Sequence, residues 1–148
     1  MVQNSLLGWI NNELRNYYQL ITNNMYKESN KKYQFNEIVA KDVGFEEAIM
    51  FSNISYWVNY NKKKDNSYDY FHEEKYWMYC TVREFKERYP FWTDAQIKRI
   101  LKNLNRKGYI ETGEFNKWNP DRTKWYAITE KEEALVESVE SVVETSHS

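Results

Sequence analysis

Positively charged and amide side chains cluster between residues 93 and 107, at a spacing that suits contact with nucleic acid. A helix over this stretch would leave the following polar residues outside or beside its apolar side: Gln96, Lys98, Arg99, Lys102, Asn103, Arg106 and Lys107. Glutamine pairs bidentately with adenine, and arginine or lysine with guanine, for about 1–3 kcal/mol of discrimination per good pair. Because recognition helices read bases from their first turns, we expect base contacts from Gln96, Lys98 and Arg99. The residues further along would suit phosphates, and the alternative is a solvated basic face.

A second cationic group follows in the polar segment from residue 113 to residue 123. Its basic residues, which we expect to reach the DNA backbone or the minor groove, are Lys117, Arg122 and Lys124. Asn116 and Asn119 are turn formers that can also donate hydrogen bonds there. Trp118 has two interpretations, because an indole at a loop tip either stacks on a base or sugar or folds back onto the hairpin.

Other chemistries find little support in the residues. The two histidines, His72 and His147, do not have a spacing that would pair either with a second metal ligand. The single cysteine, Cys80, excludes an internal disulfide and a cysteine-cluster zinc site, and we expect it to be a buried strand residue. Neither a glycine-rich phosphate loop nor a G-x-S-x-G motif is present. We therefore expect a non-enzymatic chain without metal or cofactor.

Two capped helices joined by a tight corner would position the basic residues. Thr81–Glu84 and Thr93–Gln96 each fit a capping box, in which a threonine and an acid or amide three residues later exchange hydrogen bonds. Pro90 ends the first helix, and Gly108 suits the left-handed residue after the second. The apolar positions at helical period are Val82, Phe85 and Tyr89 in the first helix and Ala95, Ile97, Ile100, Leu101 and Leu104 in the second.

After Gly108 the period changes to that of strands. Residues 109–112 and 124–128 are short β-prone runs separated by the polar loop, and residues 76–80 would pair with this hairpin. A helix, a corner, a basic helix and a hairpin with a long loop form the outline of a winged helix-turn-helix. The expected fold class is α+β, mainly α, with a three-stranded antiparallel sheet and an extra N-terminal amphipathic helix.

That extra helix is expected from Ser5 to about Met25. Its heptad-like seam consists of Leu7, Ile10, Leu14, Tyr17 and Ile21. The seam either packs on its own domain or mediates dimerisation. A further helix is expected to open at Gly44, with Glu46 and Glu47 against its positive N-terminus. Its buried side is expected to consist of Ala48, Phe51, Ile54, Trp57 and Val58. We expect a connector at residues 35–43, which contains a strand or a helical turn, and a loop at residues 62–74.

Charge is distributed unevenly along a chain whose net charge is only −1. Residues 76–129 carry 11 Lys and Arg against 6 Asp and Glu, whereas residues 130–148 carry 1 against 6. We divide the chain into an N-terminal helical extension (1–34), a winged-helix domain (35–129) and an acidic tail (130–148). The tail forms a weak amphipathic helix or is disordered. With no apolar run near 18 residues and no signal-peptide pattern, we expect a cytoplasmic chain, in a bacterial host cell, without membrane contact.

Several sequence strings resemble the N-terminal winged-helix domain of DnaD-like phage and plasmid replication proteins, the replisome organisers. The strings are Gly44–Ile49, Ile54–Trp57, Tyr76–Tyr79, Phe91–Thr93, Ile97–Arg99, Lys107–Gly108 and, most specifically, Asp121–Tyr126. The resemblance covers about Phe35 to Ile128. It implies binding of duplex origin DNA, self-association as a homodimer or higher oligomer, and contact with a host replication protein. Fuller family members continue into a second helical domain, so duplex binding and dimerisation carry over better than helicase loading.

Three functions remain open at this point. The first is a phage or plasmid protein that binds origin DNA through the basic helix and the wing. The second is a transcriptional regulator, because the same fold serves both roles. The third is a protein-interaction module, such as a phage-encoded inhibitor of a host factor, that does not use DNA.

Overall fold

The structure, a computed structural model, describes residues 2–29 and 31–147, and the side chains of residues 8–22 and 31–146. Helices predominate among these residues, accompanied by one antiparallel sheet of two strands and one of three strands. The expected α+β, mainly α, class is therefore confirmed. The chain divides into two compact units, Met1–Tyr33 and Gln34–Ser148.

The first unit consists largely of α1 (Val2–Ser29), which includes and extends the helix expected from the heptad-like seam. Four seam residues are 36–60% exposed: Ile10, Leu14, Tyr17 and Ile21. The side chain of Leu7 lies outside the described residues. The described part of the seam is thus an uncovered apolar stripe.

The second unit begins with α2 (Glu37–Val43) and α3 (Phe45–Lys62). Of the two alternatives for the connector at residues 35–43, the helical one agrees with the structure, because Asn36 caps a short helix there through a 2.8 Å bond from the Ile38 amide to its Oδ1. Seven residues hold too few turns to show a clear apolar period. Gly44, at φ 114°, separates the two helices in a conformation that favours glycine.

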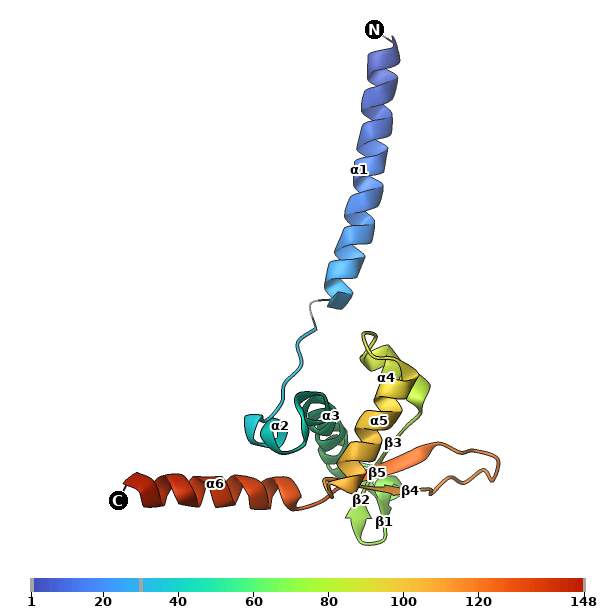
Figure 1. Ribbon diagram of the computed structural model, residues 1–148. Helices are drawn as coiled ribbons and strands as arrows, with labels where there is room; N and C mark the ends of the chain where they lie inside the picture. The colour runs from blue at the N-terminus through green and yellow to red at the C-terminus, as the bar shows by residue number, and fades with distance from the viewer. Residues whose placement is uncertain (1, 30, 148) are drawn as a thin grey trace. The chain divides into compact units, whose positions relative to one another are not determined.

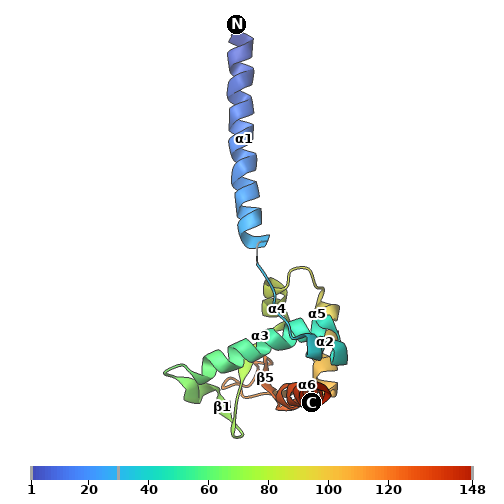
Figure 2. The same cartoon turned by 90° about the vertical axis from the view of Figure 1, so that its left-hand side faces the viewer.

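Helix α3 forms the centre of the second unit, where it packs against α2, α5 and β5. Of its expected core residues, Ala48, Phe51, Ile54 and Val58 are buried, whereas Trp57 is only partly buried. Figure 2 shows α3 running across the unit, with α2 near one end and the hairpin that contains β1 toward the other. Asn61, also buried, donates a 3.0 Å hydrogen bond to the Trp77 carbonyl and so ties that hairpin to the helix.

The segment expected as a loop and one strand contains more structure than the sequence indicated. It forms a 3₁₀ turn η1 (Ser67–Tyr70) and strands β1 (Phe71–His72), β2 (Lys75–Tyr76) and β3 (Met78–Cys80). The expected strand 76–80 is therefore divided, with Tyr76 paired to Phe71 and residues 78–80 paired to β5. The division falls at Trp77, whose buried indole donates a 2.8 Å hydrogen bond to the His72 carbonyl.

The two capped helices are present as α4 (Val82–Arg88) and α5 (Asp94–Arg106). At α5 both bonds of the expected capping box form, whereas at α4 Thr81 accepts from the Glu84 amide at 3.1 Å. Gly108 follows α5 at φ 81°, as expected. Ala95 is exposed and does not belong to the core, unlike Ile97.

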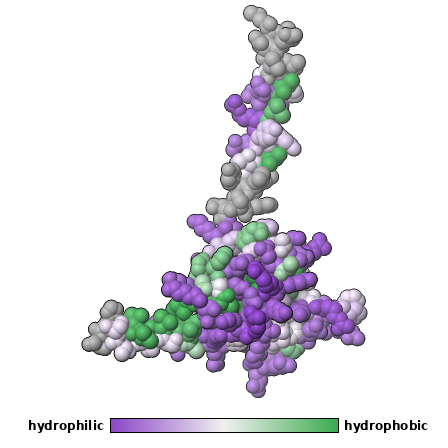
Figure 3. All heavy atoms as spheres, in the orientation of Figure 1, coloured by the Kyte–Doolittle hydropathy of each residue, from purple (hydrophilic) through white to green (hydrophobic). Residues whose placement is uncertain are grey.

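The last elements are β4 (Ile110–Gly113), β5 (Lys124–Ile128) and α6 (Lys131–His147). Strands β3, β5 and β4 form the three-stranded antiparallel sheet in that order, with Met78 opposite Tyr126 and Ile110 opposite Ile128. Figure 1 shows the long loop between β4 and β5 on the side of the unit away from α6. The acidic tail is thus helical, and hydrophobic residues cover part of α6 (Figure 3). Across the described residues, no helix combines the length and apolarity that a membrane crossing requires.

Candidate nucleic-acid interface

A groove of about 400 Å³ lies between α5, the start of α4 and the β4–β5 hairpin. Its lining residues are Val82, Lys98, Leu101, Lys102, Asn105, Thr112, Lys124 and Tyr126. Leu101 and Tyr126 are buried and form an apolar floor, whereas the three lysines are exposed. The groove therefore brings together positive charges from a helix and from a strand.

Helical spacing explains how α5 supplies its share of this charge. Lys98 and Lys102 are four residues apart, so their side chains lie on one face of the helix. Lys124 enters the same groove because the hairpin folds back beside α5, and its side chain shares a face of β5 with Tyr126. In the part of the chain that the structure describes, these three lysines form no ion pair, so their charges face solvent.

The positive surface continues into a neighbouring groove. This second groove shares Val82, Lys124 and Tyr126 with the first, and Arg122 and Asp121 also line it. Arg122 is exposed. We therefore treat Lys98, Lys102, Arg122 and Lys124 as one cationic groove formed by α5 and the root of the β4–β5 loop.

Two other residues of the loop were expected to touch DNA, and the structure places them apart from the cationic groove. Lys117 is exposed and lines a different cavity, on the side of the hairpin that faces η1 and β1. Trp118 is 69% exposed, so its ring is not folded back onto the hairpin. Of the two interpretations of this tryptophan, only the projecting one agrees with its position.

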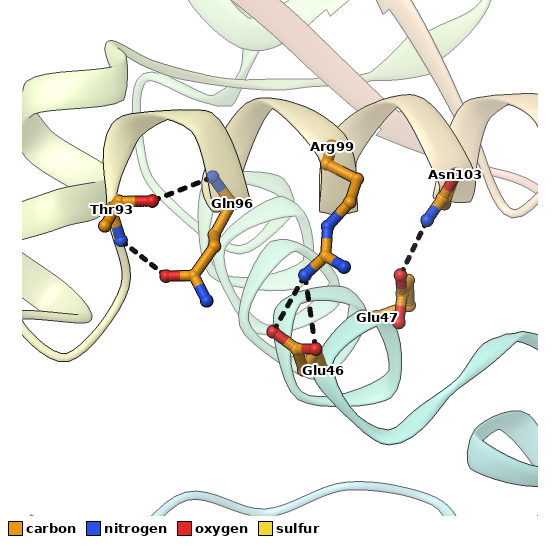
Figure 4. A network of polar contacts seen from close by, with 6 residues as sticks. All are labelled: Glu46, Glu47, Thr93, Gln96, Arg99 and Asn103. Carbon is orange, nitrogen blue, oxygen red and sulfur yellow. Dashed lines mark hydrogen bonds and ion pairs between the residues drawn. The ribbon is translucent and has the colours of Figure 1, made fainter.

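The face of α5 beside the cationic groove is in contact with the first turn of α3 (Figure 4). Arg99 Nη2 lies 3.3 Å from both carboxylate oxygens of Glu46, and Asn103 Nδ2 donates a 2.8 Å hydrogen bond to Glu47. The Arg99 side chain remains 54% exposed. Arg99 can therefore still reach a phosphate, but in competition with Glu46, whereas the Asn103 amide is held by the buried Glu47 carboxylate.

Gln96 is held by the helix cap. The side-chain Oε1 of Gln96 accepts a 2.8 Å hydrogen bond from the backbone amide of Thr93. The backbone amide of Gln96 donates to Thr93 Oγ1 at 3.2 Å (Figure 4). Bidentate pairing with adenine needs the same side-chain oxygen. The expectation that Gln96 reads a base conflicts with this conformation, because the side-chain oxygen that would accept from adenine already accepts from the Thr93 amide.

The end of α5 carries the last two predicted residues. Arg106 is exposed and donates a 3.2 Å hydrogen bond to Asn103 Oδ1. Lys107 is exposed, while its carbonyl accepts a hydrogen bond from the Lys131 ammonium group. Both cationic groups are therefore accessible to solvent. Asn105, which sequence reasoning missed, lines the cationic groove and lies seven residues after Lys98, a spacing that could have revealed it.

The other side chains that could react or bind a metal ion are buried or packed against aromatic rings. Burial of the Cys80 thiol raises its pKa to about 12, so the thiol stays protonated and unreactive at neutral pH. The His72 ring stacks on Phe115 with centroids 4.4 Å apart. Within residues 2–29 and 31–147, no three His, Cys, Asp or Glu side chains are placed to hold a metal ion together.

Comparison of the chain with protein-family models, with curated proteins and with solved structures gives no match. A function is therefore inferred from the geometry and charge of the site itself.

Proposed function

We propose that this chain is a DNA-binding module that holds duplex DNA against α5 and the β4–β5 loop. The observation that supports this most directly is the convergence of Lys98, Lys102 and Lys124, from separate elements, on one groove without ion-pair partners among the described residues. Lysines without partners are repelled by one another, and polyanionic DNA relieves that repulsion. Such binding releases counterions and is favoured entropically.

The order of the elements supports a winged helix-turn-helix within this proposal. Helices α3, α4 and α5 precede the β4–β5 hairpin, and β3 pairs with β5 at the edge of the sheet. In the proposed complex α5 enters the major groove, where Lys98 approaches base edges and Arg99, Lys102 and Arg106 approach phosphates. The loop, with Arg122, acts as the wing on the adjacent backbone.

A test is fluorescence anisotropy of a labelled duplex at several salt concentrations. Each neutralised phosphate contributes about −0.9 to the slope of log K against log salt. Lys98→Ala/Lys102→Ala should weaken binding at low salt and make the slope shallower by about 1.8. The control, Lys32→Ala/Lys41→Ala, removes the same charge from residues outside the groove. Equal slopes for the two double variants, or binding that ignores salt, would reject the proposal.

The biological role we propose is that of a cytoplasmic, non-enzymatic, DnaD-like replication protein of a phage or plasmid. The support is the resemblance in strings such as Asp121–Tyr126, whose residues line the wing root and the cationic groove. Regulation of transcription would use the same groove. Footprinting separates the two roles, because protection of repeats within a replication module favours initiation, and protection of a promoter favours regulation.

We further propose that α1 assembles the chain into a homodimer or higher oligomer, in which a host replication protein is a possible additional partner. The exposed seam residues Leu14 and Ile21 support this, since a partner helix would bury them. Leu14→Glu/Ile21→Glu in the full chain should reduce the mass measured by light scattering to that of a monomer. Asn16→Glu, placed off the seam, should leave the mass unchanged. A wild-type chain that is already monomeric would contradict the assembly.

A further inference from the structure

A second cavity, of about 510 Å³, lies between the β4–β5 hairpin, η1 and β1, and it shares Asp121 and Thr123 with the part of the cationic groove that contains Arg122. Residues of η1, β1, β3, α4, β5 and the loop line it: Asn66, Asp69, Tyr70, His72, Tyr79, Glu84, Phe115, Asn116, Lys117, Asp121, Thr123 and Trp125. Its composition differs sharply from that of the groove, because its walls are aromatic and its charged groups are mostly acidic.

The aromatic walls form a continuous set of ring contacts. Tyr70 stacks on Tyr79 with centroids 6.0 Å apart, and Tyr79 in turn lies 4.8 Å from Trp125. On the other side of Trp125, the His72 ring packs edge-on at 5.2 Å and stacks on Phe115. These rings hold one another in place, so the cavity presents several fixed π faces and edges to a ligand.

Hydrogen bonds fix the loop side of the cavity. The Trp125 indole donates a 2.7 Å bond to Asn116 Oδ1, while Asn116 Nδ2 donates to the carbonyls of Asp121 and Thr123 at 3.1 and 2.9 Å. Asp121 Oδ1 accepts from the Thr123 amide and hydroxyl. These two bonds lower the pKa of Asp121, which keeps its carboxylate ionised. The cavity is thus formed before any ligand arrives.

The charge of the lining is negative. Asp69, Glu84 and Asp121 contribute three carboxylates and Lys117 one ammonium group, a net charge of −2 with neutral histidine. Over the described residues, neither Asp69 nor Glu84 forms an ion pair. Carboxylates without an ion-pair partner beside aromatic rings favour a cation and repel phosphate.

At the rim of the cavity, one tyrosine already receives a cation from within the chain. Lys64 Nζ lies 5.0 Å from the centroid of the Tyr70 ring and 3.5 Å from its hydroxyl oxygen. Lys64 is not among the lining residues, so this contact leaves the interior open. The geometry shows that the ring is positioned for cation–π contact.

We propose that the aromatic–acidic cavity binds an arginine side chain presented by a partner polypeptide. A guanidinium group is planar, weakly hydrated and rich in donors, so it stacks on rings while donating to carboxylates. Here the half-exposed ring of Tyr79, packed against the buried Trp125, supplies the aromatic surface, and Asp69 and Glu84 supply the acceptors. This site does not depend on the proposed DNA binding, because Lys98, Lys102 and Lys124 do not line the cavity.

The test uses the full chain and fluorescein-labelled glycine–serine peptides with a single central arginine, lysine or glutamine. Anisotropy should rank the affinities as arginine, then lysine, with glutamine without measurable binding. Asp69→Asn/Glu84→Gln keeps the shape of the lining and the backbone bond to Thr81 but removes two charges. It should weaken the arginine peptide about tenfold or more, as expected for lost hydrogen bonds to charged groups.

Three further variants sharpen the test. Glu87→Gln, on the same helix but outside the lining, should leave binding unchanged, and Lys117→Ala should strengthen it by removing the like charge. Tyr79→Ala, at a side chain 46% exposed, should weaken binding without preventing folding, as circular dichroism can check.

The proposal is overturned if the glutamine peptide binds as well as the arginine peptide, or if Asp69→Asn/Glu84→Gln leaves the arginine affinity unchanged. A stacked nucleobase is the competing occupant. It would show itself if a short oligothymidylate bound more tightly to Asp69→Asn/Glu84→Gln and lost that binding in Tyr79→Ala.

Discussion

Replacing Glu46 by glutamine should strengthen DNA binding, although Glu46 itself does not line the cationic groove. In the free chain its two carboxylate oxygens lie 3.3 Å from Arg99 Nη2. A phosphate that approaches Arg99 must displace this carboxylate or share the guanidinium with it. Glu46→Gln removes the competing charge while keeping the size of the side chain.

The magnitude follows from the exposure of the pair. The Arg99 and Glu46 side chains are 54% and 23% exposed, so solvent screens their attraction. Such pairs contribute about 0.2–1 kcal/mol, and recovering that energy would tighten binding by at most about fivefold. One additional phosphate contact would also make the log–log salt slope steeper by about 0.9.

Anisotropy titrations of one labelled duplex, from low to high salt, measure both effects. Glu37→Gln is the matched control, because Glu37 pairs with Lys41 on α2, which contributes no residue to the groove. The gain should disappear when Glu46→Gln is combined with Arg99→Ala. If the gain persists in that background, or if Glu37→Gln gives the same gain, then Arg99 does not contact phosphate as we infer.

Three predictions concern stability. Thr93→Ala should lower the free energy of unfolding by about 1 kcal/mol, because α5 loses its cap. For a chain of this size that lowers Tm by about 2–4 °C in a thermal melt. An unchanged Tm would mean that the capping box contributes little. Gly44→Ala should lower the free energy of unfolding, measured in a urea titration, by about 1–3 kcal/mol. The reason is that φ of Gly44 is 114° and the new Cβ would lie 2.5 Å from Glu47 Oε2. The hydrogen bond from Tyr109 lowers the pKa of Asp42 in the folded chain. The ionised Asp42 therefore stabilises the folded state above the pKa of an unfolded aspartate, about 3.9, and this stabilisation is lost as pH falls through the lower pKa of the folded chain. Asp42→Asn should flatten the acid side of the stability profile, and an identical profile would refute that assignment.

Local chemistry explains which elements the sequence could predict. Helix caps depend on residues three positions apart, so Thr93 with Gln96 and the glycine after α5 located α5 from sequence alone. Strand β5 was equally clear because its aromatic and β-branched residues are contiguous. The β1–β2 hairpin was missed because its strands contain two residues each. Its turn also places Glu73 and Glu74 at positive φ, which glutamate seldom adopts.

The candidate site was only partly predictable for a related reason. Helical spacing put Lys98 and Lys102 on one face, but the contact between Arg99 and Glu46 joins residues 53 positions apart. A local pattern carries no information about such a pair. The same holds for Lys124, which reaches the groove only through the packing of the hairpin beside α5.

The alternation of side chains along β5 accounts for the two differently charged surfaces of one hairpin. Lys124 and Tyr126 line the cationic groove, and Trp125 lines the aromatic–acidic cavity, whereas Asp121 and Thr123 at the end of the loop line both. Successive residues of a strand point to opposite faces, so β5 separates the lysine proposed to contact phosphate from the ring proposed to contact guanidinium. A basic partner held in the cavity would therefore not compete with DNA for Lys124. It would instead add positive charge beside the duplex, which favours a ternary complex over mutual exclusion.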